Sequence, residues 1–310
     1  MHYTGTIWRP PYEAESLLLE VTAGCTHHKC KFCTLYNDLP FKFKISPLED
    51  IEADLREAQM FYHSPQRKME NKLFGRENKK SCRVFLTGAN PFVLSYNKLN
   101  EIADLIHKYF PSVKSIGSFA RITDITSKTD SQLTSLRKLG YDGLTIGIET
   151  GDDETLHFML KGYSSADILE QCSRLDTAGI KYSFFYLVGL SGAGRGEISA
   201  KRTAEICNQL HPVLNGANML TIYPDSKLYT EIQRGTWQDE GELEKYKEMR
   251  TLVEHLHIPT TFAAMGASNA FHFSVKLPTE KENLLASLGE IINNFSEERL
   301  QKNRKSVRHL

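Results

Sequence analysis

Three cysteines within nine residues follow a short apolar run near the N-terminus of the chain. Cys25, Cys30 and Cys33 stand in the stretch GCTHHKCKFC, just after the mostly apolar run LLLEV at residues 17–21. Because a loop this short cannot carry three thiolates far apart, they can turn toward one point. Thiolates are the soft ligands that zinc and iron–sulfur clusters select. The cysteine loop therefore predicts a metal site at the end of the first apolar run.

The number of ligands separates two kinds of metal site. A structural zinc site closes itself with four protein ligands, whereas three cysteines on a cubane cluster leave one iron open. His27 or His28 could supply the fourth ligand of a zinc site. No CxxC or HxxxH motif follows downstream, where zinc fingers usually carry a second ligand pair. We therefore favour the iron–sulfur cluster, with both histidines exposed, and keep a zinc-binding interaction module as the alternative.

The charge balance argues against a general affinity for nucleic acid. The chain has 38 Lys and Arg against 38 Asp and Glu, and it is 40% hydrophobic, as a globular protein is. One basic stretch, residues 67–83, carries seven Lys or Arg and two Glu. A small-molecule ligand is therefore favoured, and the basic stretch keeps an RNA partner open as the alternative.

Targeting signals are missing from the sequence as given. The first fifteen residues do not combine a basic region with an apolar run, and no apolar run approaches the roughly 18 residues of a membrane helix. Cys82, Cys172 and Cys207 are scattered and resemble small core residues with reduced thiols. These features predict a cytoplasmic protein with no membrane partner, a compartment that suits an oxygen-sensitive cluster.

Short apolar runs alternate with helical stretches from residue 16 onward, which favours parallel strands joined by crossover helices. A helix is expected to start at Ser46, as N-cap, and Pro47. Residues 63–81 are polar and charged, so we expect a surface loop there. The predicted strands are Ser16–Thr22, Arg83–Thr87, Val113–Phe119, Gly143–Ile148, Tyr182–Val188 and Ala217–Tyr223. Together they predict an α/β fold, an open TIM-like partial (β/α)6 barrel.

The domain organisation follows from this pattern. We expect an N-terminal arm over residues 1–15, the partial barrel over 16–224, and a C-terminal α/β extension over 225–310 that covers the barrel. In such sheets the chemistry lies at the carboxyl ends of the strands. The cysteine loop, the Gly88 turn and the strand-end residues Arg121, Glu149 and Gly189 all fall at those ends.

The cysteine loop resembles the motif of the radical S-adenosylmethionine (radical SAM) superfamily. The usual motif is CxxxCxxC with an aromatic residue before the last cysteine, where this chain has Phe32. Here the spacing is CxxxxCxxC, with one extra residue in the first gap. The stretch IGIETG at residues 146–151 resembles IGxExG of a branch that includes Elongator-like and oxygen-independent coproporphyrinogen oxidase-like proteins. The resemblance extends over most of the chain.

The resemblance implies a set of residues that contact SAM. The turn of Gly88, Ala89 and Asn90 would meet the SAM amino group, although Asn90 stands where a glutamate is usual. Arg121 would pair with the SAM carboxylate. The remaining contacts implied are Glu149 with the ribose or the ammonium, and Leu187, Gly189 and a backbone group of Phe32 with adenine. Each has a structural alternative: an ordinary loop at Gly88, a surface arginine, and a Glu149 paired with a lysine.

The resemblance also implies an activity. A [4Fe–4S] cluster on Cys25, Cys30 and Cys33 would reduce SAM, giving methionine and a 5′-deoxyadenosyl radical that takes a hydrogen atom from an unidentified substrate. An external one-electron reductant, flavodoxin or ferredoxin, is implied as a partner. The sequence shows neither a second cysteine cluster nor an N-terminal cobalamin-binding domain, and it does not name the substrate.

Overall fold

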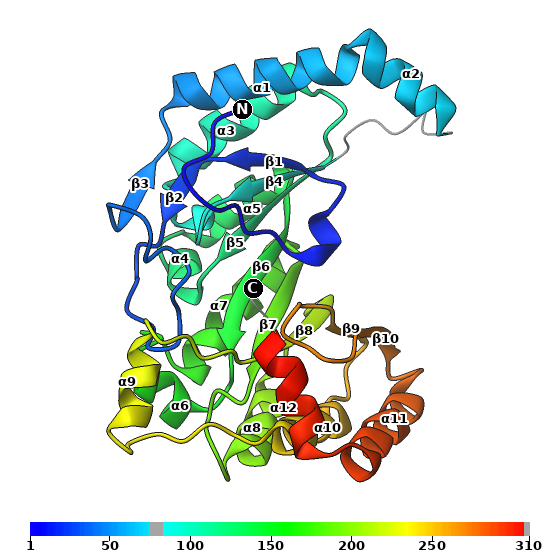
Figure 1. Ribbon diagram of the computed structural model, residues 1–310. Helices are drawn as coiled ribbons and strands as arrows, with labels where there is room; N and C mark the ends of the chain where they lie inside the picture. The colour runs from blue at the N-terminus through cyan, green and yellow to red at the C-terminus, as the bar shows by residue number, and fades with distance from the viewer. Residues whose placement is uncertain (75–82, 307–310) are drawn as a thin grey trace. The chain divides into compact units, whose positions relative to one another are not determined.

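The computed structural model describes residues 1–74 and 83–306 (Figure 1). The chain forms two compact units. The first contains Met1–His28, Tyr36–Thr145 and Ala178–Ile180, and the second contains Lys29–Leu35, Ile146–Thr177 and Lys181–Leu310. The cysteine loop is therefore divided, with Cys25 in the first unit and Cys30 and Cys33 in the second.

The strands hydrogen-bond in the order β1-β4-β5-β6-β7-β8-β9-β10, an eight-stranded sheet in which β1 and β10 are the edges. The pairs β1–β4, β4–β5, β7–β8 and β8–β9 are parallel, and β10 runs antiparallel to β9. The strand bounds are β1 Leu17–Glu20, β4 Arg83–Thr87, β5 Ser115–Ala120, β6 Tyr141–Glu149, β7 Tyr182–Val188, β8 Leu214–Met219, β9 Thr260–Ala264 and β10 Phe273–Leu277. The predicted α/β fold is confirmed.

The first unit packs its helices through regularly spaced apolar residues. Its helices are α1 Leu48–His63, α2 Pro65–Leu73, α3 Tyr96–Tyr109, α4 Ile122–Thr126 and α5 Asp130–Lys138. In α3 the buried residues are Leu99, Ile102, Ala103 and Ile106, the spacing of one helical face. A short pair of antiparallel strands, β2 Thr22–Gly24 and β3 Phe43–Ile45, flanks the start of the cysteine loop.

The second unit contains the later helices and the C-terminal segment. Its helices are α6 Asp153–Phe158, α7 Ser165–Ala178 (the last residue of which belongs to the first unit), α8 Gly196–Cys207, α9 Lys227–Gln233, α10 Glu242–His255, α11 Lys281–Asn294 and α12 Glu297–Ser306. The C-terminal region adds β9 and β10 to the sheet, while α10 packs against α8 and α11. Cys172 and Cys207 are buried core residues, as predicted.

Several predicted boundaries differ from the structure by one to four residues, and two of these differences have a clear cause. The sixth strand lies at Leu214–Met219 instead of Ala217–Tyr223. Its sequence, LNGANM, contains Asn and Gly, which disfavour strands, and pairing with β7 on one side and β9 on the other overrides that preference. The first helix has Pro47, not Ser46, at its N-cap position.

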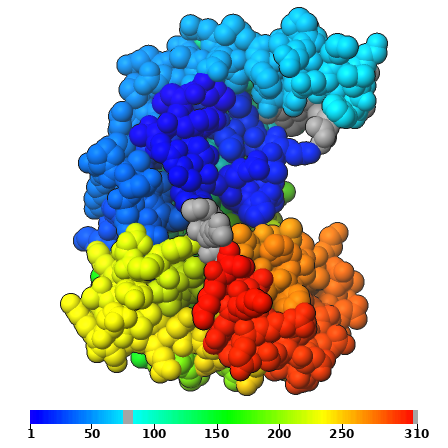
Figure 2. Space-filling model, viewed as in Figure 1, coloured from blue at the N-terminus to red at the C-terminus, as the bar shows by residue number. Residues whose placement is uncertain are grey.

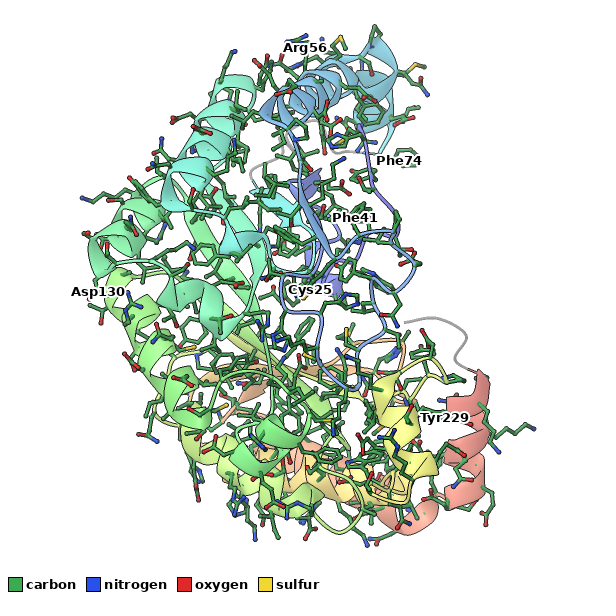
Figure 3. The ribbon with its side chains drawn as sticks, turned by 90° about the vertical axis from the view of Figure 1, so that its left-hand side faces the viewer. Cys25, Phe41, Arg56, Phe74, Asp130 and Tyr229 are labelled. Carbon is green, nitrogen blue, oxygen red and sulfur yellow. The ribbon has the colours of Figure 1, made fainter. Side chains whose placement is uncertain are left out.

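The expected loop over residues 63–81 contains a helix. In α2 the Ser64 side chain accepts a hydrogen bond from the Arg67 N–H at 3.2 Å, and Pro65 occupies the first turn, which together start a helix. This helix buries no residue, and Phe74 at its end is 71% exposed and projects outward (Figure 3). The predicted surface position is therefore confirmed for residues 63–74. Residues 75–81 and Cys82 lie outside the described part of the chain.

The arm that precedes β1 is anchored to the first unit. Glu13 accepts hydrogen bonds from Arg83 at 2.6–3.0 Å, and Tyr12 shares one with Thr145 at 2.7 Å. Figure 2 shows the arm (dark blue) on the surface of the first unit. None of the helices within residues 1–74 and 83–306 is long and apolar enough to cross a membrane.

Candidate functional site

The first arm of the cysteine loop is fixed by backbone contacts in the first unit. The Cys25 N–H donates to the Lys42 carbonyl at 2.9 Å, and Gly24 adopts a φ of +77°. A Cβ at Gly24 would clash with the same carbonyl, so the turn into Cys25 requires glycine. Cys25 itself is half-buried and lies among the loops that precede α1 (Figure 3).

The second arm of the loop is fixed within the second unit. The Lys31 N–H donates to the Met159 carbonyl at 3.1 Å, and the Lys31 carbonyl accepts from the Leu228 N–H at 2.7 Å. The Lys31 ammonium pairs with Glu231 at 3.0 Å. These contacts hold Cys30 and Cys33, both half-buried, on either side of an anchored residue.

The donor chemistry of the loop fits an iron–sulfur cluster. It offers three thiols and no carboxylate, the soft ligand set that such clusters use. The two histidines that could close a zinc site, His27 and His28, are half-buried where the sequence predicts exposed residues. His28 shares a ring-nitrogen hydrogen bond with Asn37 at 3.0 Å. Across residues 1–74 and 83–306, no three His, Cys, Asp or Glu side chains gather closely enough to hold a metal ion.

The Gly88 turn packs directly against the start of the cysteine loop. Gly88 has a φ of +130°, and a Cβ there would lie 2.5 Å from the Thr22 carbonyl oxygen. The Ala89 N–H donates to the Gly24 carbonyl at 3.4 Å. Glycine is therefore required at this turn because the backbone of the neighbouring strand approaches it so closely.

Asn90 connects the cysteine loop to α4. Its fully buried amide donates to Thr26 Oγ1 at 2.8 Å and to the two carboxylate oxygens of Asp124 at 3.0 and 3.2 Å. Its oxygen accepts from the Thr26 N–H at 3.4 Å. Asn90, which the resemblance predicts to be an acceptor for SAM, therefore has its hydrogen-bond partners within the protein. It positions Thr26, the residue next to Cys25.

Arg121 lies at the N-cap of α4, where its N–H donates to Asp124 Oδ2 at 2.8 Å. Burial raises the pKa of Asp124 to about 6, against the opposing effect of hydrogen bonds from Arg121 and Asn90. Burial also lowers the pKa of Lys128 to about 8; its ammonium donates to the Phe92 carbonyl at 2.6 Å. Sequence reasoning missed Asp124 and Lys128, although an acidic residue three positions after a strand-end N-cap is a recognisable signal.

Glu149 at the end of β6 pairs with a lysine. Its Oε1 lies 3.1 Å from the Lys161 ammonium, which also donates to the Gly147 carbonyl at 3.0 Å. Glu149 has a φ of +64°, a left-handed conformation that is unusual for a side chain this long. The Lys161 ammonium lies 5.7 Å from the centre of the Phe32 ring, so the pair also reaches the cysteine loop. Lys161 was not predicted from the sequence.

Phe32 and Leu187 come together on one apolar cluster of the second unit. Both pack against a buried core of Met159, Leu190, Leu220, Leu228 and Trp237. The structure therefore unites two of the residues that the resemblance assigns to adenine. An apolar surface of this kind suits a flat aromatic ring.

Gly189, the third such residue, lies above a buried carboxyl pair. Its N–H donates to Glu248 Oε2 at 2.6 Å, and a Cβ there would lie 2.6 Å from the Lys245 side chain. Burial and the neighbouring Glu248 raise the pKa of Glu240 to about 10. Glu240 therefore stays protonated at neutral pH beside Glu248, and sequence reasoning missed this pair.

A family model connects these features to known proteins. The model described as the Radical SAM superfamily matches residues 19–200, more than half of the 310-residue chain. The matched region contains the three cysteines and every predicted SAM contact. A comparison with curated protein sequences found no match.

Solved structures share the fold at low sequence identity. The methyltransferase TsrM from Kitasatospora setae is 16% identical with a TM-score of 0.53, over 71% of this chain and 39% of that one. The [FeFe]-hydrogenase maturase HydG is 14% identical with a TM-score of 0.51, over 80% and 51%. Methylornithine synthase (PylB) is 15% identical with a TM-score of 0.50, over 79% and 64%.

These structures confirm the partial barrel and say nothing about the reaction of this chain. This chain aligns with less than two thirds of the length of each. Membership of the Elongator-like branch stays a prediction. The family match establishes that the chain belongs to the radical SAM superfamily.

Proposed function

We propose that Cys25, Cys30 and Cys33 hold a [4Fe–4S] cluster and that the enzyme cleaves SAM reductively to act on a small-molecule substrate. The observation that supports this most is the loop itself: three thiols in nine residues, with each arm anchored by backbone hydrogen bonds. When bound, the cluster would supply the electron for reductive cleavage of SAM to methionine and a 5′-deoxyadenosyl radical, which would remove a hydrogen atom from the substrate.

The remaining residues of the site position the cysteine loop and bind SAM. Asn90 and Asp124 hold the segment after Cys25 through Thr26. Phe32 and Leu187 offer an apolar surface for adenine, and Lys161 fixes the Glu149 carboxylate at the end of β6. Arg121 supplies a cation for the SAM carboxylate, a charge-assisted contact. An external one-electron reductant, flavodoxin or ferredoxin, delivers the electron.

The charge of the chain supports the choice of a small-molecule substrate. The balanced charges of the chain favour a small molecule over RNA. In the described part of the basic stretch 67–83, Arg67 already pairs with Glu70 at 3.1 Å on the exposed helix α2. RNA retention that weakens steeply with salt would transfer the assignment to a nucleic-acid substrate.

Metal analysis of anaerobically reconstituted protein tests the ligand assignment. We expect about four iron and four sulfide per chain. Alanine at any one of Cys25, Cys30 and Cys33 should abolish cluster binding. The matched controls Cys172→Ala and Cys207→Ala remove buried thiols elsewhere and should keep the full iron content. Stoichiometric zinc without iron in protein purified without oxygen would contradict the proposal.

A further inference from the structure

The turn after β7 is contacted by a segment that lies beyond the family match. The match ends at residue 200, and residues 237–248 form the loop before α10 and the first half of that helix. Helix α10 packs against β7 and α8, and Figure 1 shows α8 and α10 side by side. The turn itself, residues 189–194, has the sequence GLSGAG. A backbone with so many glycines is flexible by itself, so its neighbours decide its shape.

Glu248 on α10 accepts hydrogen bonds from both β7 and the turn. Its Oε2 accepts from the Gly189 N–H at 2.6 Å, and its Oε1 accepts from the Tyr186 hydroxyl. Glu248 is 1% exposed and Tyr186 is 2% exposed, so water does not compete for either hydrogen bond. A buried carboxylate is costly without its donors, and this arrangement therefore fixes the Gly189 backbone against α10.

The neighbouring carboxyl group leaves the negative charge on Glu248. Burial and the adjacent Glu248 raise the pKa of Glu240 to about 10, so Glu240 is neutral at neutral pH. Burial also raises the pKa of Glu248, but its two hydrogen bonds and the Lys245 ammonium oppose that shift. Of the two carboxyl groups, Glu248 is therefore the one that holds the turn as a carboxylate.

The far end of the turn is held by the same segment. The Ala193 N–H donates to the Gln238 carbonyl at 3.0 Å, and the Gly194 N–H donates to the Glu244 carboxylate. Together with Gly189, three N–H groups of the turn donate to residues 238–248. Contacts at both ends fix the backbone arrangement of the turn.

We propose that Glu248 is a positioning residue for SAM, because it fixes the turn that meets the adenine ring. The resemblance assigns adenine to Phe32, Leu187 and Gly189. Leu190, within the turn, belongs to the apolar cluster against which Phe32 and Leu187 pack. A turn that is already held in its binding conformation loses little freedom when the ligand binds, which raises affinity. The inference deepens the proposed function and rests on it, and it gives residues beyond the family match a part in SAM binding.

Steady-state SAM cleavage by the reconstituted protein with dithionite separates positioning from a structural role. Glu248→Leu removes the acceptor, and we expect the KM for SAM to rise about tenfold while kcat stays within about twofold of wild type. The inhibition constant of 5′-deoxyadenosine, which carries the adenine ring, should rise by the same factor, and that of methionine should not change. Glu254→Leu, at an exposed position of α10, is the matched control and should behave as wild type.

Two further variants complete this test. Glu248→Gln keeps an oxygen acceptor for the Gly189 N–H and should restore most of the SAM affinity. Glu244→Leu, at a half-buried position, removes the acceptor of the Gly194 N–H and should raise the KM for SAM by a smaller factor. A wild-type KM in folded, iron-loaded Glu248→Leu, or in Glu244→Leu where Glu248→Leu does not fold, would overturn the proposal. An equal rise in the inhibition constant of methionine would overturn it too.

Hydrogen exchange distinguishes failure of this inference from failure of the proposed function. In cluster-free wild type the amide hydrogens of residues 189–194 should exchange slowly, whereas Glu248→Leu should speed their exchange about tenfold or more and Glu248→Gln should not. Equal exchange in wild type and Glu248→Leu would show that Glu248 does not hold the turn. Wild type that cleaves no SAM would refute the proposed function, and the exchange rates would still decide the positioning role of Glu248.

Discussion

The ends of β4 and β6 present a polar side chain in two different ways. After β4, Asn90 is fully buried and shares its amide with the carboxylate of Asp124. At the end of β6, Glu149 is paired with a cation, Lys161, at 3.1 Å. In the first arrangement burial raises the pKa of the carboxyl group although the charges of Arg121 and Lys128 oppose that shift, while in the second a lysine pairs directly with the carboxylate. Polar residues at two strand ends therefore look alike in the sequence, but their side chains lie in different electrostatic surroundings in the folded protein.

The charge-balanced end should be the more fragile when one partner is lost. Lys161 is 5% exposed and Glu149 16% exposed in their side chains. Lys161→Met leaves the Glu149 carboxylate without its cation, and we expect a loss of about 4 kcal/mol in the free energy of unfolding. Urea denaturation measures it. The double variant Lys161→Met/Glu149→Gln should recover most of the loss, and a single variant as stable as wild type would show that the pair is unimportant.

The carboxylate at the other end should respond to pH instead. The pKa of Asp124 is about 6 in the folded protein and 3.8 in its ordinary state, so between these values the folded protein binds more protons. Its contribution to stability is therefore greatest below pH 4 and is lost as pH rises to about 6, by about 3 kcal/mol. The wild-type stability minus that of Asp124→Asn, from urea titrations at pH 4–7, should fall over this window. A flat difference would exclude the raised pKa.

The smallest effect concerns the amide of Asn90. Asn90→Ala removes the hydrogen bonds that the Asn90 amide donates to Thr26 and Asp124. This loss should lower the free energy of unfolding by about 2 kcal/mol. It should also loosen the segment next to Cys25, so reconstituted protein should lose iron faster to a chelator. Asn97→Ala, at an exposed position of α3, is the control. Equal iron loss in the two variants would mean that Asn90 does not support the cysteine loop.

The sequence predicts well what depends on local pattern. Buried parallel strands such as β4, with Val84, Phe85 and Leu86 all fully buried, stand out as apolar runs bounded by turn residues. The cysteine loop and the glycine turn at Gly88 could also be identified from the local sequence. The strand β8 could not, because LNGANM becomes a strand only through its neighbours.

Partners that come from distant segments were out of reach of sequence reasoning. Glu149 was identified, but its pairing with Lys161 depends on how the chain returns after α6. Asp124 and Asn90 are 34 residues apart and meet only in the folded unit. Such contacts are properties of the fold and carry no local signal.

The most direct test of the central claim is whether reduced protein cleaves SAM. Anaerobically reconstituted enzyme with dithionite should convert SAM to 5′-deoxyadenosine and methionine in equal amounts, measured by liquid chromatography and mass spectrometry. Cys30→Ala should form neither product, while Cys172→Ala should match wild type. An iron-loaded, folded wild type that binds SAM and releases no 5′-deoxyadenosine would contradict the account.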